Sequence, residues 1–187
     1  MKRILLLVCL LVLAGCAKQP VIANLNPFLG EQPPGIFRSG STAVISGQDA
    51  RKSAEIIVYH SDDPATRLAN ADAPPILISA RLADGFRDQG LDIQPSSPVH
   101  LKFVINELEV QVSHQKMLYT ANAKTHIAFT VESRGTVFTK VFKREANNDS
   151  ATRPRLPELE KMLNDQLANI LMQITQDEEI RALIARQ

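Results

Sequence analysis

Apolar and polar side chains alternate along residues 100–132, the segment HLKFVINELEVQVSHQKMLYTANAKTHIAFTVE, and this alternation predicts two long β-strands. The apolar side chains occupy odd positions up to Ile105, even positions from Leu108 to Val112, and odd positions again from Tyr119 onward. Successive side chains of a strand point to opposite faces, so a turn or an irregularity must absorb each change of phase. The pattern therefore predicts a hairpin that contains one β-bulge.

A two-residue loop at Gln115 and Lys116, together with a one-residue bulge at Asn106 or Glu107, accounts for both changes. The predicted cross-strand pairs are Val112 with Tyr119, Val110 with Ala121, Leu108 with Ala123, Ile105 with Thr125, Phe103 with Ile127, and Leu101 with Phe129. All the apolar side chains then share one face of the hairpin. The opposite face carries a solvated row of mixed charge, made of His100, Lys102, Glu107, Glu109, Asn122, Lys124 and His126.

Shorter patterns on either side of the hairpin predict the remaining elements. Runs rich in β-branched and aromatic residues predict strands at residues 42–46, 55–59 and 136–143. Gly47, Gln48 and Asp49 separate the first two strands, and a polar loop at 62–72 follows the second. In the strand at 136–143, either Val137 and Val141 or Phe138 and Phe142 can face the core, so its buried face stays open.

Helical spacing of apolar residues predicts one helix from about residue 77 to a stop at Gly90, and a second over residues 159–174. Thr175 and Glu178 have the spacing of a capping box, which predicts a further short helix through residues 180–184. The expected order is β-β-α-β-β-β-α-α. Because strands and helices do not alternate regularly, we expect an α+β fold in which helices pack on one face of an antiparallel sheet.

The first residues have the three-part layout of an export signal. Lys2 and Arg3 precede an uninterrupted apolar run over residues 4–14, and small residues follow that run. The run is too short for a membrane span, because a helix needs about 20 residues to cross the hydrocarbon core of a bilayer. We therefore expect residues 1–15 to be a signal peptide that is removed.

Leu13, Ala14, Gly15 and Cys16 resemble the lipobox of bacterial lipoproteins. The resemblance implies that the Cys16 sulfur takes a diacylglyceryl group through a thioether and that Cys16 becomes the first mature residue. Two or more acyl chains hold a protein on a membrane essentially permanently, at about 0.8 kcal/mol per buried methylene. The alternative is ordinary secretion, in which Ala14, Gly15 and Cys16 form a small-residue cleavage site.

The mature chain divides into a lipidated N-terminus with a tether, residues 16–40, and a single α+β domain, residues 41–187. The tether has no hydrophobic period, and it contains Pro20, Pro27, Gly30, Pro33, Pro34, Gly35 and Gly40. Proline keeps such a segment extended and semi-rigid, so it could lift the domain tens of ångströms from the membrane at about 3 Å per residue.

Composition agrees with anchoring and excludes some partners. The chain has two cysteines, and Cys9 would leave with the signal, so Cys16 serves anchoring only and no disulfide is expected. Loss of Lys2 and Arg3 leaves 19 of the 21 basic residues against 20 acidic ones, a net charge of −1. This near-neutrality argues against a nucleic-acid partner and against a polybasic membrane-binding surface.

Several stretches together resemble the YajG lipoproteins of Gram-negative bacteria. They are the lipobox followed by AK, QGLDIQPSSPVHLKFVINELEVQVS, YTANAKTHIAF, and ITQDEEIRALI near the end, which cover most of residues 85–187 plus the signal. The resemblance implies location and fold and carries over no catalytic residue. Ala17 follows the cysteine where an aspartate is the usual signal for inner-membrane retention, so the resemblance implies the outer membrane, with the domain facing the periplasm.

The sequence contains no glycine-rich phosphate loop, no Gly-x-Ser-x-Gly elbow and no His-Glu-x-x-His, and we expect no enzyme, no metal and no cofactor. The histidines are His60, His100, His114 and His126. In the predicted register His126 faces Val104, about 13 Å from His100, which is too far for two ligands of one zinc ion. The acidic pair Asp62 and Asp63 suits a polar loop rather than a calcium site, and Asp177, Glu178 and Glu179 suit the positive end of a helix.

Three functions remain as hypotheses. The first is a noncatalytic binding or scaffold module that is anchored to the outer membrane through Cys16 and binds another envelope protein. The second is a binder of a small envelope ligand, such as a lipid or glycan fragment, which predicts an apolar pocket between sheet and helices. The third is a hydrolase, for which the sequence offers no constellation of catalytic residues.

Overall fold

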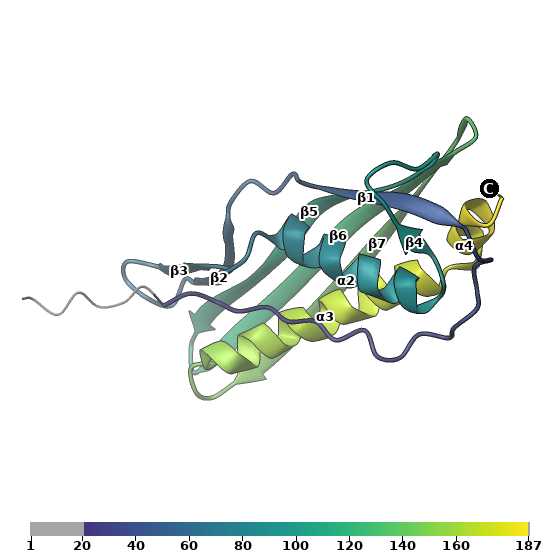
Figure 1. Cartoon of the computed structure of the whole chain (residues 1–187). Helices are drawn as coiled ribbons and strands as arrows, with labels where there is room; N and C mark the ends of the chain where they lie inside the picture. The colour runs from purple at the N-terminus through teal and green to yellow at the C-terminus, as the bar shows by residue number, and fades with distance from the viewer. Residues whose placement is uncertain (1–20, 187) are drawn as a thin grey trace, which may run out of the picture.

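The computed structural model describes residues 21–186, and the predicted signal peptide and Cys16 lie outside these residues. In this described part of the chain, seven strands form one mixed sheet and three helices accompany it (Figure 1). The elements are β1 (Thr42–Asp49), β2 (Glu55–Tyr59), β3 (Thr66–Ala69), α2 (Pro74–Asp88), β4 (Asp92–Ile93), β5 (Val99–Gln115), β6 (Leu118–Ser133), β7 (Thr136–Ser150), α3 (Leu156–Gln176) and α4 (Glu178–Ile184).

The predicted hairpin is present as β5 and β6, and its bulge lies where the pattern placed it. The register shifts between Ile105 and Glu107, which leaves Asn106 as the extra residue. The predicted loop was wrong by one residue, because Gln115 pairs with Leu118 and the loop is therefore Lys116 and Met117. Every predicted pair is consequently displaced by two residues on β6, but a shift of two keeps each side chain on its predicted face.

Strand β7 completes a three-stranded antiparallel meander and is longer than predicted. It continues to Ser150 instead of ending near residue 143. Its turn from β6 uses Arg134 and Gly135, whose φ angles of 49° and 77° suit a tight two-residue connection. The open question of its buried face is settled, because Phe138 and Phe142 pair with the core-facing Val131 and Ile127.

The prediction of a purely antiparallel sheet was wrong. Strands β1 and β2 lie end to end along the free edge of β5 and run parallel to it, with Val44 opposite His100 and Ile57 opposite Val110. Parallel neighbours need a long crossover connection, usually a helix, and α2 lies on the path from β1 and β2 to β5. The order is β-β-β-α-β-β-β-β-α-α, because the short strands β3 and β4 were not predicted.

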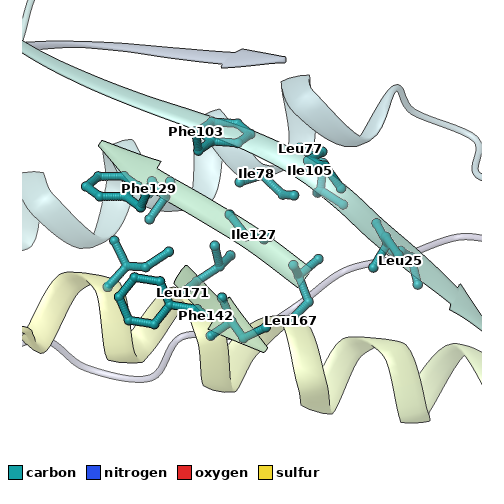
Figure 2. Packing of buried hydrophobic residues seen from close by; sticks show 14 of the residues in the cluster. Leu25, Leu77, Ile78, Phe103, Ile105, Ile127, Phe129, Phe142, Leu167 and Leu171 are labelled. Carbon is teal, nitrogen blue, oxygen red and sulfur yellow. The ribbon is translucent and has the colours of Figure 1, made fainter. Parts of the chain in front are cut away.

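Helices α2 and α3 cover one face of the sheet, as predicted, and the core lies between (Figures 1 and 2). Figure 2 shows Phe103, Ile105, Ile127 and Phe129 of the sheet packed toward Ile78, Leu167 and Leu171 of the helices. Gly90, with φ 96°, follows the end of α2 as expected. Within residues 21–186, no helix is long and apolar enough to cross a membrane.

Helix α4 is present as predicted, but its N-cap differs. The cap is Asp177, whose carboxylate accepts hydrogen bonds from the backbone N–H groups of Glu179 and Ile180 at 3.0 and 3.1 Å. The predicted capping residue, Thr175, instead lies buried in the last turn of α3. Aspartate is among the strongest N-cap residues, so it competes successfully with the threonine two positions earlier.

Residues 21–40, predicted as a free tether, lie against the domain as an N-terminal strap. Figure 1 shows this segment running beside α2 and α3 before it enters β1. Ala23 forms a parallel bridge with Asn70, and the side chains of Ala23, Leu25, Leu29 and Phe37 are buried. The proline and glycine residues prevent regular structure in this segment, but these apolar residues between them attach it to the core.

Candidate functional site

The predicted lipidation site, Cys16 with Leu13, Ala14 and Gly15, lies outside the described residues, and the described chain begins at Val21. From there the strap is fixed to the domain by backbone hydrogen bonds. The Ala23 N–H donates to the Ala69 carbonyl at 3.0 Å, and the Ala71 N–H donates to the Ala23 carbonyl at 2.8 Å. The strap is therefore attached to the rest of the domain only a few residues after the predicted lipid anchor.

Polar contacts continue this attachment along both helices. The backbone N–H groups of Asn24 and Asn26 donate to Glu160 and Asn164 of α3, at 2.7 and 2.8 Å. Farther along, Gln32 is buried between the helices, where the Gln89 side-chain amide donates to the Gln32 Oε1 at 3.1 Å. A buried polar side chain that is hydrogen-bonded fixes a specific geometry, so the strap has one defined path.

A shallow groove lies where the strap begins. It has a volume of about 760 Å³, and its lining includes Val21, Tyr59, Leu68, Arg153 and Leu156. The Arg153 guanidinium stacks over the Tyr59 ring at 4.2 Å from the centroid. Arg153 also pairs with Asp62 at 2.7 Å. We call this feature the Tyr59 groove.

Tyr59 is held rigidly in that groove. Its hydroxyl donates to the Pro154 carbonyl at 3.1 Å, and the side chain is almost fully buried. Burial raises the pKa of the Tyr59 phenol above its usual value, although the Arg153 charge opposes this effect. Tyr59 is therefore a neutral aromatic wall at neutral pH. No local pattern in the sequence indicates this groove, because its lining comes from four separate segments.

The second candidate surface is the face of β5, β6 and β7 opposite the helices, which we call the open face. Its cross-strand rows alternate in charge, with Glu109, Lys124 and Glu145 in one row and Glu107, His126 and Lys143 in the next. Lys102 and Glu132 form an ion pair at 2.7 Å nearer the β6–β7 turn. The predicted mixed-charge row is thus present, and its charges compensate one another across the strands.

The predicted histidines do not come together. His60 and His100 are exposed, His114 stacks on Tyr119 at 4.2 Å between ring centroids, and His126 lies opposite Glu107 rather than opposite Val104 as predicted. Burial and the nearby Lys143 charge lower the pKa of His126, while Glu107 opposes them. Within residues 21–186, no group of three histidine, cysteine, aspartate or glutamate side chains is placed to hold a metal ion.

The acidic residues have structural partners. Asp62 pairs with Arg153, and Asp177 pairs with Lys140 at 2.7 Å while it caps α4. Burial alone would raise the pKa of Asp177, but the Lys140 ammonium and the N–H groups of Ile180 and Glu179 outweigh it and hold this pKa below its usual value. Glu178 and Glu179 lie in the first turn of α4, at its positive end as predicted.

Comparison with known proteins gives relatives over almost the full length. The uncharacterized lipoprotein YajG of Escherichia coli strain K12 is 27% identical, with 98% of this chain and 96% of the relative covered. The protein of strain CFT073 matches equally well. The predicted resemblance to the YajG lipoproteins is therefore confirmed.

One solved structure shares the fold at low sequence identity. Protein XCC0632 of Xanthomonas campestris superposes with a TM-score of 0.64 at 14% identity, over 87% of this chain and 96% of that one. A minor lipoprotein of Acinetobacter baumannii gives a TM-score of 0.45 at 14% identity, over 76% and 93% of the two chains.

The family model described as "Uncharacterized lipoprotein" matches residues 36–185, which is most of the chain. The chain therefore belongs to this family of lipoproteins, Lipoprotein_16, and is held to a membrane of the cell envelope by lipid.

Proposed function

We propose that this lipoprotein is anchored to the outer membrane through Cys16 and that its periplasmic domain is a noncatalytic module that binds another envelope protein. One observation carries the proposal. Both long helices and the strap lie on the same side of the sheet, so the long strands β5, β6 and β7 present an open face on the other side.

The chemistry of the open face favours a protein partner. Its rows alternate between carboxylates and basic side chains, a pattern that offers neither the continuous positive charge needed for a polyanion nor a continuous apolar surface for acyl chains. One cross-strand row between the charged ones is apolar, and it consists of Val104, Ala128 and Val141. A small apolar patch within a polar surface is typical of a transient protein interface.

Site-specific photo-crosslinking in cells tests the binding proposal. A photoreactive amino acid replaces Val141, which is exposed in the apolar row of the open face, and a matched variant carries it at Lys161 on the exposed side of α3. We expect one recurrent protein adduct from position 141 and none from position 161. Equal adducts from both positions, or no protein adduct from position 141, would contradict the assignment of the open face.

The membrane assignment has a separate test. Ala17→Asp introduces the residue that favours inner-membrane retention directly after Cys16, and Lys18→Asp places the same charge one residue farther along. We expect the unchanged protein and Lys18→Asp to fractionate with the outer membrane, and Ala17→Asp to fractionate with the inner membrane. Inner-membrane location of the unchanged protein would contradict the proposal.

The Tyr59 groove supports a second candidate function, the binding of a small envelope ligand. The Arg153 guanidinium is half exposed there beside apolar side chains, and a guanidinium can bind an anionic group of a lipid or glycan fragment. Extraction and mass spectrometry of the purified protein test it. A bound lipid or glycan that is lost in Tyr59→Ala, but retained after a substitution on the open face, would favour this function over the first.

A further inference from the structure

One end of the molecule must stay close to the anchoring membrane. Five residue steps separate Cys16 from Val21, and at about 3.3–3.6 Å per residue they span at most about 18 Å. Val21 is the start of the strap, and Ala23 already forms two backbone hydrogen bonds with the segment that follows β3. The domain therefore has little freedom to leave the membrane while the strap is in place.

Several turns lie at the same end as Val21. Tyr59, at the end of β2, pairs with Val112, and β5 continues from there to the loop at Lys116 and Met117. The connection from β7 to α3 also lies here, because Arg153 contacts Tyr59. Figure 1 shows the start of the described chain, the β2–β3 turn, the tip of β5 and the start of α3 together at the left end of the molecule.

This end presents exposed apolar side chains that the core does not use. Met117 is 84% exposed at the tip of the β5–β6 loop, with Leu118 beside it, and Val21 and Ile22 are exposed where the strap begins. Single exposed apolar residues are normal on any protein. Here four of them lie at the end that the anchor holds near a bilayer, and one stands at the tip of a projecting loop.

The charges at this end are balanced. Arg153 pairs with Asp62 at 2.7 Å, and Arg155 pairs with Glu158 at 2.8 Å. The surface thus provides apolar contact without a strong positive field, and anionic lipid is not required for it. Lys116, next to Met117, has a long side chain that can extend its ammonium to the headgroups while its methylenes stay among apolar groups.

We propose that this end of the domain rests on the bilayer that holds the lipid anchor, with Met117 and Leu118 inserted at the boundary between headgroups and acyl chains. This inference rests on the proposed anchoring at Cys16. The open face then stands roughly upright on the membrane. β6 contains 16 residues, so the β6–β7 turn lies about 50 Å from the inserted loop.

The test uses the full lipidated protein in phosphatidylcholine vesicles that carry bromine on the acyl chains as a quencher. Met117→Cys and Arg134→Cys each provide a single thiol for an environment-sensitive fluorophore, because Cys9 leaves with the signal and Cys16 is consumed by lipidation. The label at 117 should shift its emission to shorter wavelength and be quenched, and the label at 134 should do neither. Adding phosphatidylglycerol should not change the quenching.

A second pair of variants isolates the apolar contact. In the Met117→Cys background, Leu118→Asp should reduce the quenching, whereas Val137→Asp, at another exposed apolar position beside the far turn, should leave it unchanged. Absence of quenching at 117, or equal quenching at 117 and 134, would overturn the inference. The mass of the mature chain reports lipidation independently, so a failure of anchoring at Cys16 is distinguishable from a domain that is anchored but does not touch the bilayer.

Discussion

Gly47→Ala gives a direct test of how β1 packs on β5. Gly47 lies opposite Phe103 in the parallel pairing, and an added Cβ would lie 2.1 Å from the Cζ of the Phe103 ring and 2.5 Å from its Cε2. Carbon atoms in contact are normally about 3.5–4.0 Å apart, so the ring would have to move by roughly 1.4 Å. Phe103 is only 1% exposed, and a close-packed core offers no free space for that movement.

The expected magnitude follows from two opposing contributions. Inserting a methyl group into a well-packed core typically costs about 1–3 kcal/mol. Replacing glycine also reduces the entropy of the unfolded chain, which returns about 0.4–1 kcal/mol. We therefore expect a net destabilisation of about 1–2 kcal/mol, or a fall in Tm of roughly 2–8 °C for a domain of this size.

Thermal and urea denaturation of the purified protein measure this effect. Ser46→Ala is the matched control, because its side chain points to the opposite face of β1. Phe103→Leu shortens the obstructing side chain, so the double variant with Gly47→Ala should be less destabilised than the sum of the two single variants. A Gly47→Ala protein as stable as Ser46→Ala, or strict additivity in the double variant, would refute the steric argument.

Three further predictions concern the anchor, the open face and the cap of α4. Cys16→Ser should abolish lipidation and leave an unprocessed precursor in the inner membrane, so a normally cleaved, soluble product in cell fractions would contradict the lipidation assignment. Because the pKa of folded His126 is lowered, the unfolded chain binds the proton first as pH falls through about 6.5. Protonation of His126 therefore favours the unfolded chain and lowers the free energy of unfolding toward acid pH. His126→Gln should therefore show a smaller fall in urea midpoint than the unchanged protein between about pH 8 and about pH 5. Asp177→Ala should cost about 1 kcal/mol in urea unfolding through the lost N-cap, whereas Asp177→Asn, which keeps the cap, should cost less, and equal losses would show that the cap has no role.

The strongly periodic parts of the fold were predictable because their periods are local. The alternation around Ile105 and Leu108 requires a bulge wherever one face is buried, and the structure has it at Asn106. The hairpin loop was misplaced because neither Gln115–Lys116 nor Lys116–Met117 contains the Asn-Gly or Gly signal that fixes a two-residue turn. Lys116 adopts φ 58° without such a signal, so the sequence alone did not distinguish the two loops.

The errors arise where long-range packing decides the conformation. Gly47 was expected to separate two strands, but in the structure it lies within β1, where its missing side chain makes room for Phe103. The parallel direction of β1 and β2 could not be read from their sequences, because a short β-branched run is compatible with either direction. The Tyr59 groove was missed for a related reason, since Tyr59 and Arg153 meet only after the whole chain has folded.

The strap also sets the order in which this chain can complete its fold. Asn24 of the strap is hydrogen-bonded to Glu160, and Gln32 to Thr175. These partners lie 136 and 143 positions later in the chain. Contacts between such distant positions carry a large loop-closure entropy and slow folding. During synthesis, which proceeds from the N-terminus, the strap cannot pack in its native place until α3 has been made. The strap is therefore among the last parts of the domain to reach its native contacts, although it is the first part of the domain to be made.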